Sequence, residues 1–193
     1  ARRVSARLPE KVSLRGPAAR SGGDAVTTRV LICDDHALVR DAIRGLLQQQ
    51  DDIEVVGEAA DGADALARAA TLTPDVLVID IGMKGMTGIE ATRRIAEVAP
   101  ATRVLAVSMH TEREFVAEML KAGARGYLVE DAAREDVLAA VRTVAAGGTY
   151  LSATVAGVVV DDYVRQLGTP ADAGQDSPLT ARELEVLALI AEG

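Results

Sequence analysis

The stretch VLVIDIGMKGMTGIEATRRI, residues 76–95, decides the fold of this chain. It opens with four apolar residues, 76–79, and the run stops at the charged side chain of Asp80. A run of this length and β-branched content is typical of a strand buried on both faces. Similar runs lie at residues 29–33, 53–56, 104–107 and 126–129, with stretches of helical spacing between them. We therefore predict a doubly wound α/β domain with a five-stranded parallel sheet over residues 27–147.

The C-terminal quarter of the sequence predicts two further helices joined by a linker. Residues 152–167 place apolar side chains at helical spacing and predict a linker helix, and the stretch rich in Gly, Pro, Ala and Asp that follows predicts a linker. Thr180 and Glu183 form a capping box, in which both side chains satisfy backbone N–H groups at the start of a helix. The expected units after the first 26 residues are therefore 27–147, 148–178 and 179–193.

The composition limits what the chain can bind. Its 193 residues are 49% hydrophobic and 26% charged with a net charge of −8, which is typical of a globular protein. Residues 1–26 hold six basic and two acidic residues without apolar periodicity, so we expect a flexible basic extension ahead of an acidic body. The body lacks the basic surface that binds duplex DNA, and four aromatic residues in the whole chain offer few stacking platforms for single strands.

Cysteine usage and hydropathy predict a cytoplasmic protein. The one cysteine, Cys33, cannot form an intramolecular disulfide, and no secretory segment precedes it, so we expect a reducing compartment and a buried, inert thiol. The longest uncharged run, residues 143–160, contains three glycines and several hydroxyl side chains. We therefore expect a helix end, a turn and another helix there, and no membrane partner.

Three carboxylates follow predicted strands at the places where this fold class binds ligands. Asp34 and Asp35 come directly after the first strand and Asp80 directly after the third, and ligands bind beyond the carboxyl ends of such strands. Close carboxylates repel one another, and a divalent cation that prefers hard oxygen ligands, Mg²⁺, relieves the repulsion. An aspartate beside this cation can act as a nucleophile and form an aspartyl phosphate. Each aspartate taken alone is equally consistent with a helix N-cap or an ordinary strand end.

Four segments together resemble the receiver domain of bacterial two-component response regulators. They are VLICDDHALVR (30–40), VLVIDIGMKGMTGIEATRRI (76–95), VLAVSMH (104–110) and AGARGYLVEDA (122–132). The closing segment SPLTARELEVLALIAEG (177–193) resembles the opening of a helix-turn-helix domain of the NarL/FixJ (LuxR-type) family. The resemblance implies a flavodoxin-like receiver fold, then a linker helix and the first helix of a helix-turn-helix domain that is incomplete in this chain.

The receiver resemblance also implies a role for each residue that matches the family's motifs. It implies that Asp80 accepts a phosphoryl group, that Asp34, Asp35, Asp80 and the backbone carbonyl of Gly82 bind Mg²⁺, that Ser108 is the switch hydroxyl and that Tyr127 is the switch aromatic. His36 and His110 lie nearby, and we expect both to be structural or rim residues rather than ligands.

Two positions depart from the family pattern close to the expected site. Glu130 stands where a lysine usually follows the switch aromatic, so an anion replaces a cation that would neutralise developing charge. Lys84 stands where the loop after Asp80 usually has proline. We hypothesise that Lys84 partly replaces the missing positive charge, and the alternative is that Lys84 points into solvent.

The resemblance leaves two functions that share a role in transcription. In the first, a sensor histidine kinase donates a phosphoryl group to Asp80, and the altered receiver switches homodimerisation and DNA binding. Such a chain is not an enzyme, beyond removing its own phosphoryl group. In the second, Glu130 has silenced this chemistry, Mg²⁺ binding is weakened or lost, and the chain is a pseudo-receiver that acts as a phosphorylation-independent dimerisation or ligand-sensing module.

Two further functions are disfavoured by the sequence. An independent hydrolase is a poor fit because Gly82 occupies the place of a partner acid and no glycine-rich phosphate loop is present. Specific DNA binding by this chain itself is not expected, because the family reads DNA with a helix beyond residues 179–192, which form only the first helix of that domain.

Overall fold

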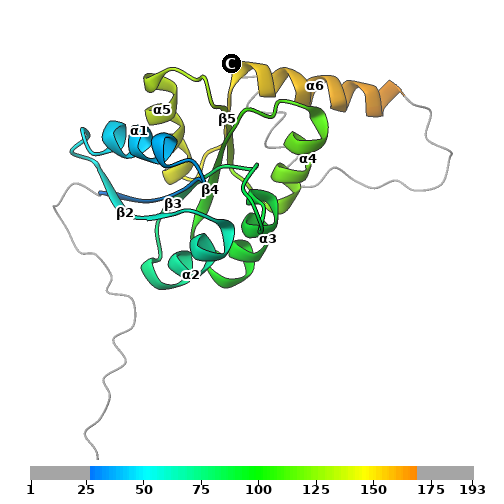
Figure 1. The fold of residues 1–193 in the computed structure, drawn as a ribbon. Coiled ribbons are helices and arrows are strands. Elements are labelled where there is room, and N and C mark those ends of the chain that lie inside the picture. The colour runs from blue at the N-terminus through cyan, green and yellow to red at the C-terminus, as the bar shows by residue number, and fades with distance from the viewer. Residues whose placement is uncertain (1–26, 169–193) are drawn as a thin grey trace, which may run out of the picture.

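The structure, a computed structural model, describes residues 27–168, with side chains as far as residue 165. The predicted basic extension at 1–26 and the predicted helix-turn-helix segment at 179–193 lie outside the described residues. The described part is a layered α/β fold in which a parallel sheet lies between two layers of helices (Figure 1). The predicted fold class is therefore confirmed.

The sheet has the strand order β2-β1-β3-β4-β5-β6, and every neighbouring pair is parallel. Its strands are β1 (Thr28–Cys33), β2 (Ile53–Ala59), β3 (Val76–Ile79), β4 (Arg103–Ser108), β5 (Gly126–Val129) and β6 (Tyr150–Leu151). The four residues of β3 are completely or almost completely buried, as their uninterrupted apolar sequence predicts. β3 lies in the middle of the sheet, so Asp80 emerges at the centre of its carboxyl edge.

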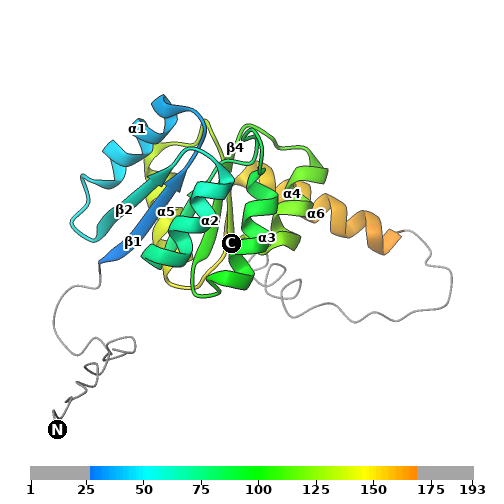
Figure 2. The same cartoon turned by 60° about the horizontal axis from the view of Figure 1, so that its bottom comes forward.

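The helices are divided between the two faces of the sheet. They are α1 (Ala37–Leu47), α2 (Gly62–Leu72), α3 (Gly88–Val98), α4 (Arg113–Ala122), α5 (Arg134–Ala145) and α6 (Ala153–Gly168). One apolar cluster joins the sheet to α1 and α5, and the other joins it to α2, α3, α4 and α6. Figure 2 shows α2, α3 and α4 side by side on the second of these faces. Apolar burial on both faces provides most of the stability expected for such a sheet.

The prediction of five strands was wrong by one, because a short sixth strand completes the sheet. β6 begins after a turn at Gly147, whose φ of +91° lies in the left-handed region that glycine adopts readily. The Tyr150 N–H donates to the Arg125 carbonyl at 3.1 Å, and the Ser152 N–H donates to the Tyr127 carbonyl at 3.0 Å. A strand of two residues carries no apolar run, so the sequence pattern contains no signal for it.

Helix α6 packs against α4 and against β5 and β6, and its far end projects away from the domain (Figure 1). Val155 is completely buried, and Val158 and Val159 pack on the same cluster. Arg113 of α4 forms an ion pair with Asp162 of α6. The predicted linker helix is thus docked on the domain over its first turns. None of the helices among residues 27–168 is both long and apolar enough to cross a membrane.

Candidate functional site

The acidic residues predicted to form a site do meet at the carboxyl edge of the sheet. Asp34 follows β1 and Asp80 follows β3, and these strands are neighbours with Cys33 paired to Ile79. The Asp80 N–H donates to the Cys33 carbonyl at 2.9 Å, which extends the strand pairing to the acidic residue itself. Two strands of the same sheet therefore deliver carboxylates to one place, as the sequence predicted.

Asp34, Asp35 and His36 form a cluster whose potential metal-ligand atoms lie within 4.8 Å of one another. His36 Nδ1 lies 3.3 Å from Asp34 Oδ1 and 3.0 Å from Asp35 Oδ1. Asp35 Oδ1 is buried yet has no hydrogen bond of acceptable geometry, even though the imidazole is close. A buried carboxylate oxygen without a donor is costly unless something else satisfies it. This unsatisfied oxygen, beside further carboxylates, fits a hard divalent cation such as Mg²⁺.

Burial and like charge both act on the Asp80 carboxylate. Its pKa is raised above the usual 3.8 by burial and by the neighbouring charges of Asp34 and Asp35. The N–H groups of Gly82 and Ile81 oppose this rise by donating to Oδ2 at 3.1 Å and to Oδ1 at 2.7 Å. Two backbone donors thus hold the Asp80 carboxylate in one orientation. Burial and the neighbouring carboxylates still make its charged form less favourable than it would be in water.

We expect Asp80→Asn to raise the melting temperature in EDTA at pH 7 by a few degrees at most. The raised pKa means that the charged carboxylate destabilises the folded state at neutral pH. This penalty disappears as pH falls through the folded-state pKa, so the advantage of the variant should shrink with acidification. Thermal denaturation of both proteins from pH 7 downwards measures it. A variant less stable than the parent at every pH would contradict the expectation.

Ser108 is the last residue of β4, and Tyr127 is the second residue of the neighbouring strand β5. Ser108 is 1% exposed and Tyr127 is completely buried. The Tyr127 hydroxyl donates to the His110 carbonyl at 2.5 Å, and the His110 N–H donates to Ser108 Oγ at 3.2 Å. Burial raises the pKa of Tyr127 to about 12, against the effect of its hydrogen bond with Ser108. The predicted switch residues are therefore linked directly by this hydrogen bond and also through the backbone of His110.

His110 lies on the rim of the site, with its side chain about 40% exposed. Its ring stacks on Phe115 of α4 with a centroid distance of 4.3 Å, and its Nδ1 lies 3.4 Å from Glu112 Oε2. Its Nε2 points toward Gly82, on the Asp80 loop. The one signal available in the sequence was the spacing in VLAVSMH, which places a histidine two residues after Ser108.

The two departures from the family pattern lie on the rim of this site. The Glu130 N–H donates to the Ser108 carbonyl at 3.0 Å, which fixes the backbone of Glu130 beside β4 while its side chain is exposed. Lys84 is exposed, and no ion pair involving it occurs among residues 27–168. The structure therefore gives no support to a direct contact of Lys84 with the acidic residues.

The loop after Asp80 is packed closely against β1 and the start of α3. Met83 is 3% exposed, and its sulfur lies 3.3 Å from Cys33 Sγ. Burial raises the pKa of the Cys33 thiol to about 12, so this cysteine is buried and unreactive at neutral pH. Gly88 begins α3, and a Cβ placed there would lie 2.1 Å from the Asp80 carbonyl oxygen. Glycine at this position permits the close approach of α3 to the backbone that follows β3.

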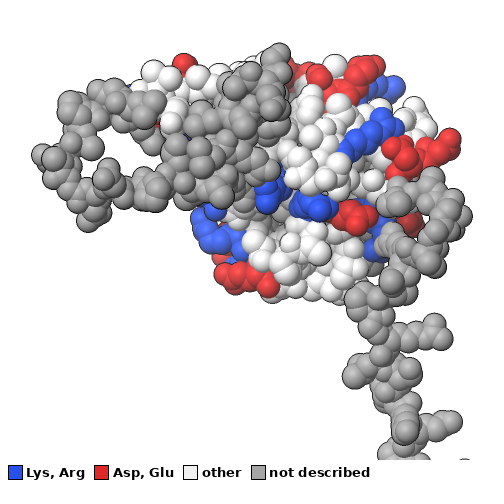
Figure 3. Space-filling model, turned by 180° about the vertical axis from the view of Figure 1, so that it is seen from behind, with Lys and Arg blue, Asp and Glu red and all other residues white. Residues whose placement is uncertain are grey.

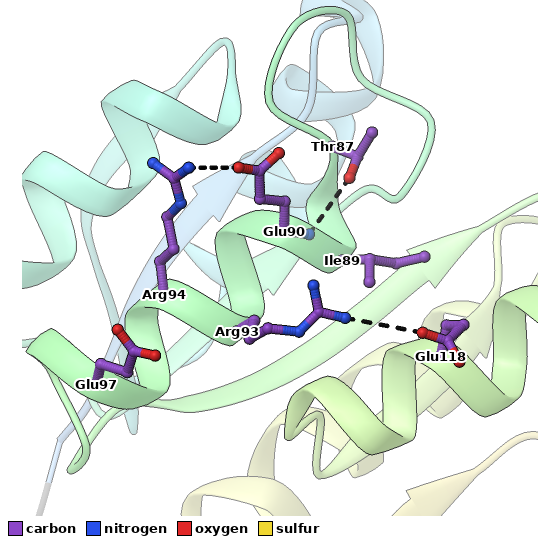
Figure 4. Close-up of a pocket in the computed structure, with 7 residues that line it drawn as sticks. All are labelled: Thr87, Ile89, Glu90, Arg93, Arg94, Glu97 and Glu118. Atoms are coloured by element: carbon purple, nitrogen blue, oxygen red, sulfur yellow. Dashed lines mark hydrogen bonds and ion pairs between the residues drawn. The ribbon is translucent and has the colours of Figure 1, made fainter.

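A separate hollow of about 620 Å³ lies between α3 and α4 (Figure 4), and none of Asp34, Asp35 and Asp80 lines it. Its lining is Thr87, Ile89, Glu90, Arg93, Arg94, Glu97 and Glu118. Arg94 pairs with Glu90, and Arg93 reaches Glu118 of α4 at 3.7 Å. Since each arginine already faces a carboxylate, this hollow presents no free cation to an anionic ligand.

The charged side chains do not gather into a basic surface on the face shown in Figure 3, where basic and acidic residues are interspersed. An interspersed surface does not attract the phosphate backbone of duplex DNA. The described residues visible on this face therefore form no continuous basic surface.

Comparison with known proteins agrees with this geometry. The response regulator receiver domain family matches residues 30–142. The oxygen regulatory protein NreC of Staphylococcus epidermidis is 39% identical over 169 residues, which cover 86% of this chain and 78% of NreC. The signal receiver domain of the response regulator NarL from Mycobacterium tuberculosis is 37% identical with a TM-score of 0.61, covering 63% of this chain and 98% of that structure. A LuxR-family two-component response regulator from Aurantimonas sp. SI85-9A1 is 33% identical with a TM-score of 0.68, covering 72% of this chain and 99% of that structure. The chain therefore belongs to the two-component response regulators, in the NarL/LuxR-type family.

Proposed function

We propose that this response regulator controls transcription through a phosphoryl group accepted by Asp80. One observation carries the proposal: four neighbouring strands bring the groups that such a site needs to the carboxyl edge of the sheet. β1 and β3 supply the carboxylates Asp34, Asp35 and Asp80, while β4 and β5 supply the hydroxyls of Ser108 and Tyr127. A charged nucleophile, a cation-binding cluster and nearby hydroxyl groups are the parts of a phosphoryl-acceptor site.

The proposed transfer takes place on the side-chain oxygens of Asp80. One carboxylate oxygen attacks the phosphorus of a phosphohistidine on a sensor histidine kinase, so that a P–O bond forms and the P–N bond breaks. The electron pair of the broken bond stays on the imidazole nitrogen, which takes up a proton. The Ile81 and Gly82 N–H groups hold the carboxylate in place throughout, which reduces the entropic part of the barrier.

The phosphoryl group leaves by hydrolysis. Water attacks the phosphorus, the P–O bond to Asp80 breaks with its electron pair returning to the carboxylate, and inorganic phosphate leaves with the hydrogens of the water. We therefore propose that the chain accepts a phosphoryl group and that its own catalytic activity is at most the hydrolysis of the acyl phosphate on Asp80.

Mg²⁺ is the cation that we propose for the acidic cluster. Asp34, Asp35 and Asp80 would hold it by carboxylate oxygens, with the Gly82 carbonyl as a further ligand. The buried and unsatisfied Asp35 Oδ1 supports this assignment. When bound, the cation would neutralise charge on the phosphoryl oxygens during transfer.

We propose that the phosphoryl group is sensed by Ser108 and relayed through Tyr127 to α4. Both hydroxyls contact the backbone of His110, which leads into the loop before α4. A change at Ser108 therefore biases the start of α4, and α4 contacts α6 through Arg113 and Asp162. The proposed consequence is a shift between two states that favours homodimerisation and the binding of DNA through the domain that begins at residue 179.

The alternative is a pseudo-receiver, and one residue favours it. Glu130 places an acidic side chain on the rim next to Ser108, where the family pattern has a lysine. In this alternative the phosphoryl chemistry is silent, and dimerisation or a ligand controls the chain. The cytoplasm is the expected compartment for both functions.

Intact mass spectrometry after incubation with acetyl phosphate and Mg²⁺ separates the two. The acceptor function predicts a single phosphoryl adduct on the parent protein, none on Asp80→Asn, and none on the parent in EDTA. An unmodified parent together with a modified Glu130→Lys variant would establish the pseudo-receiver. An adduct that persists in Asp80→Asn would assign the acceptor to another residue.

A further inference from the structure

The His110 imidazole is held in place from two sides. Its ring stacks on Phe115 with an interplanar angle of 27°, and its Nδ1 faces Glu112 Oε2 at 3.4 Å. Its backbone is fixed independently, because its N–H donates to Ser108 and its carbonyl accepts from Tyr127. The side chain is about 40% exposed, so its remaining nitrogen, Nε2, is open to a ligand.

Nε2 and the Asp80 carboxylate face the same small volume in front of Gly82. The point where a residue larger than glycine would carry its Cβ lies 3.5 Å from Asp80 Oδ2 and 3.8 Å from His110 Nε2. Because Gly82 has no side chain, this volume stays open between the acceptor oxygen and the imidazole. A phosphoryl group on Asp80 Oδ2 can enter it and meet Nε2.

Three other basic side chains near the site have different surroundings, and the first of them, His36, lies beside Asp34 and Asp35. Arg40 donates to the Asp34 carbonyl at 2.6 Å and lies 3.6 Å from Glu58. Lys84 is exposed and makes no ion pair within the described part of the chain. Glu130, at the place of the family's lysine, is an acceptor and cannot donate a hydrogen bond to a phosphoryl oxygen.

We propose that His110 donates a hydrogen bond from Nε2 to a phosphoryl oxygen on Asp80, and so provides the donor that Glu130 cannot provide. The inference rests on the proposed function, since it requires that Asp80 accepts a phosphoryl group. His110 transfers no proton in this role. In this role both ring nitrogens carry a proton, so that Nδ1–H faces Glu112 and Nε2–H faces the phosphoryl oxygen. The ring stabilises negative charge on the transferring oxygens, while Phe115 and Glu112 keep it in position.

Two replacements of His110 separate the effect of its N–H donor from the effect of its stacking on Phe115. His110→Phe keeps an aromatic ring against Phe115 but has no donor, whereas His110→Gln keeps an N–H donor without the aromatic ring. With acetyl phosphate and Mg²⁺, the rate of adduct formation followed by intact mass should fall about tenfold in His110→Phe, the usual contribution of one charge-assisted hydrogen bond. It should stay within about threefold of the parent in His110→Gln. Met109→Ala, a change at the neighbouring residue whose side chain is largely exposed, should not alter the rate.

A second pair of variants tests whether His110 substitutes for the lysine. In a Glu130→Lys background the lysine supplies its own donor, so His110→Phe should then cost less than about threefold. A smaller effect of His110→Phe in Glu130→Lys than in the parent would show an energetic coupling between positions 110 and 130, as expected if both side chains donate to the same phosphoryl oxygens. A loss that remains about tenfold in both backgrounds would overturn the substitution.

The outcomes distinguish this inference from the proposed function. An adduct that forms on the parent, and at the same rate on His110→Phe, overturns the role of His110 and leaves Asp80 as the acceptor. A parent protein and a Glu130→Lys variant that both stay unmodified overturn both proposals together. Thermal denaturation of each variant identifies any slow reaction that results from unfolding, and His110→Gln then decides the matter, because a folded His110→Gln as slow as His110→Phe excludes a donor role.

Discussion

Glu130→Lys should accelerate phosphorylation of Asp80 by acetyl phosphate about a hundredfold. The substitution removes an anion from the rim beside Ser108 and puts a cation in its place, while the phosphoryl group brings further negative charge to a site that already holds three carboxylates. A preorganised positive group at such a site typically lowers the barrier by about 3 kcal/mol, and each 1.4 kcal/mol is about a tenfold change in rate. Intact mass recorded over time measures the rate directly.

A charge-matched control separates the local effect from the overall charge of the protein. Glu54→Lys makes the same change in net charge on β2, near the amino-terminal end of the sheet and so opposite the acidic cluster. We expect this control to react at the rate of the parent. Equal acceleration in both variants would show that long-range attraction of the phosphodonor is responsible, and unchanged rates in both would show that Glu130 does not restrain the reaction.

Gly88→Ala should destabilise the domain by about 3 kcal/mol, which lowers the melting temperature by roughly 10 °C. The added methyl carbon would lie 2.1 Å from the Asp80 carbonyl oxygen and 2.9 Å from Ile81 Cα. These are backbone atoms at the end of a central, buried strand, so neither can move aside cheaply. The loss therefore exceeds what the better helix propensity of alanine restores. Urea or thermal denaturation measures it.

The contrasting glycine in α1 provides the control. Gly45 lies inside a helix with nothing within 4 Å of its Cβ position. Gly45→Ala should therefore stabilise the protein by up to about 1 kcal/mol, through helix propensity alone. A Gly88→Ala protein as stable as the parent would mean that α3 can withdraw from the Asp80 loop without loss.

The strands with uninterrupted apolar runs were predictable from the sequence. It was also predictable that the residues after these strands lie close together at the carboxyl edge of the sheet. Asp34 and Asp80 follow runs that are almost completely buried, and parallel pairing brings such ends together whatever the residues between them. β6 was not predictable because its two residues pair through backbone groups that leave no trace in the side-chain pattern. The docking of α6 on α4 was missed for a related reason, since an ion pair such as Arg113–Asp162 joins residues far apart in the chain.

Side-chain direction was the other limit of sequence reasoning. The distance along the chain made Lys84 the natural candidate for a compensating cation, because it lies four residues after Asp80. The loop instead buries Met83 against Cys33 and leaves Lys84 exposed. His110 is thirty residues from Asp80 in sequence, yet its ring faces the Asp80 loop because Phe115 and Glu112 hold it there. The stacking of one ring on a neighbouring helix cannot be deduced from spacing alone.

The anchoring of α6 at one end gives it the mechanics of a lever. β6 fixes its beginning, the ion pair with Arg113 ties its middle to α4, and its remaining turns project from the domain. At 1.5 Å per residue, sixteen residues span about 24 Å, so a tilt of about 5° at the base displaces the tip by about 2 Å. A movement of α4 too small to break any packing contact is therefore amplified, at the tip, into a displacement comparable to the radius of an atom.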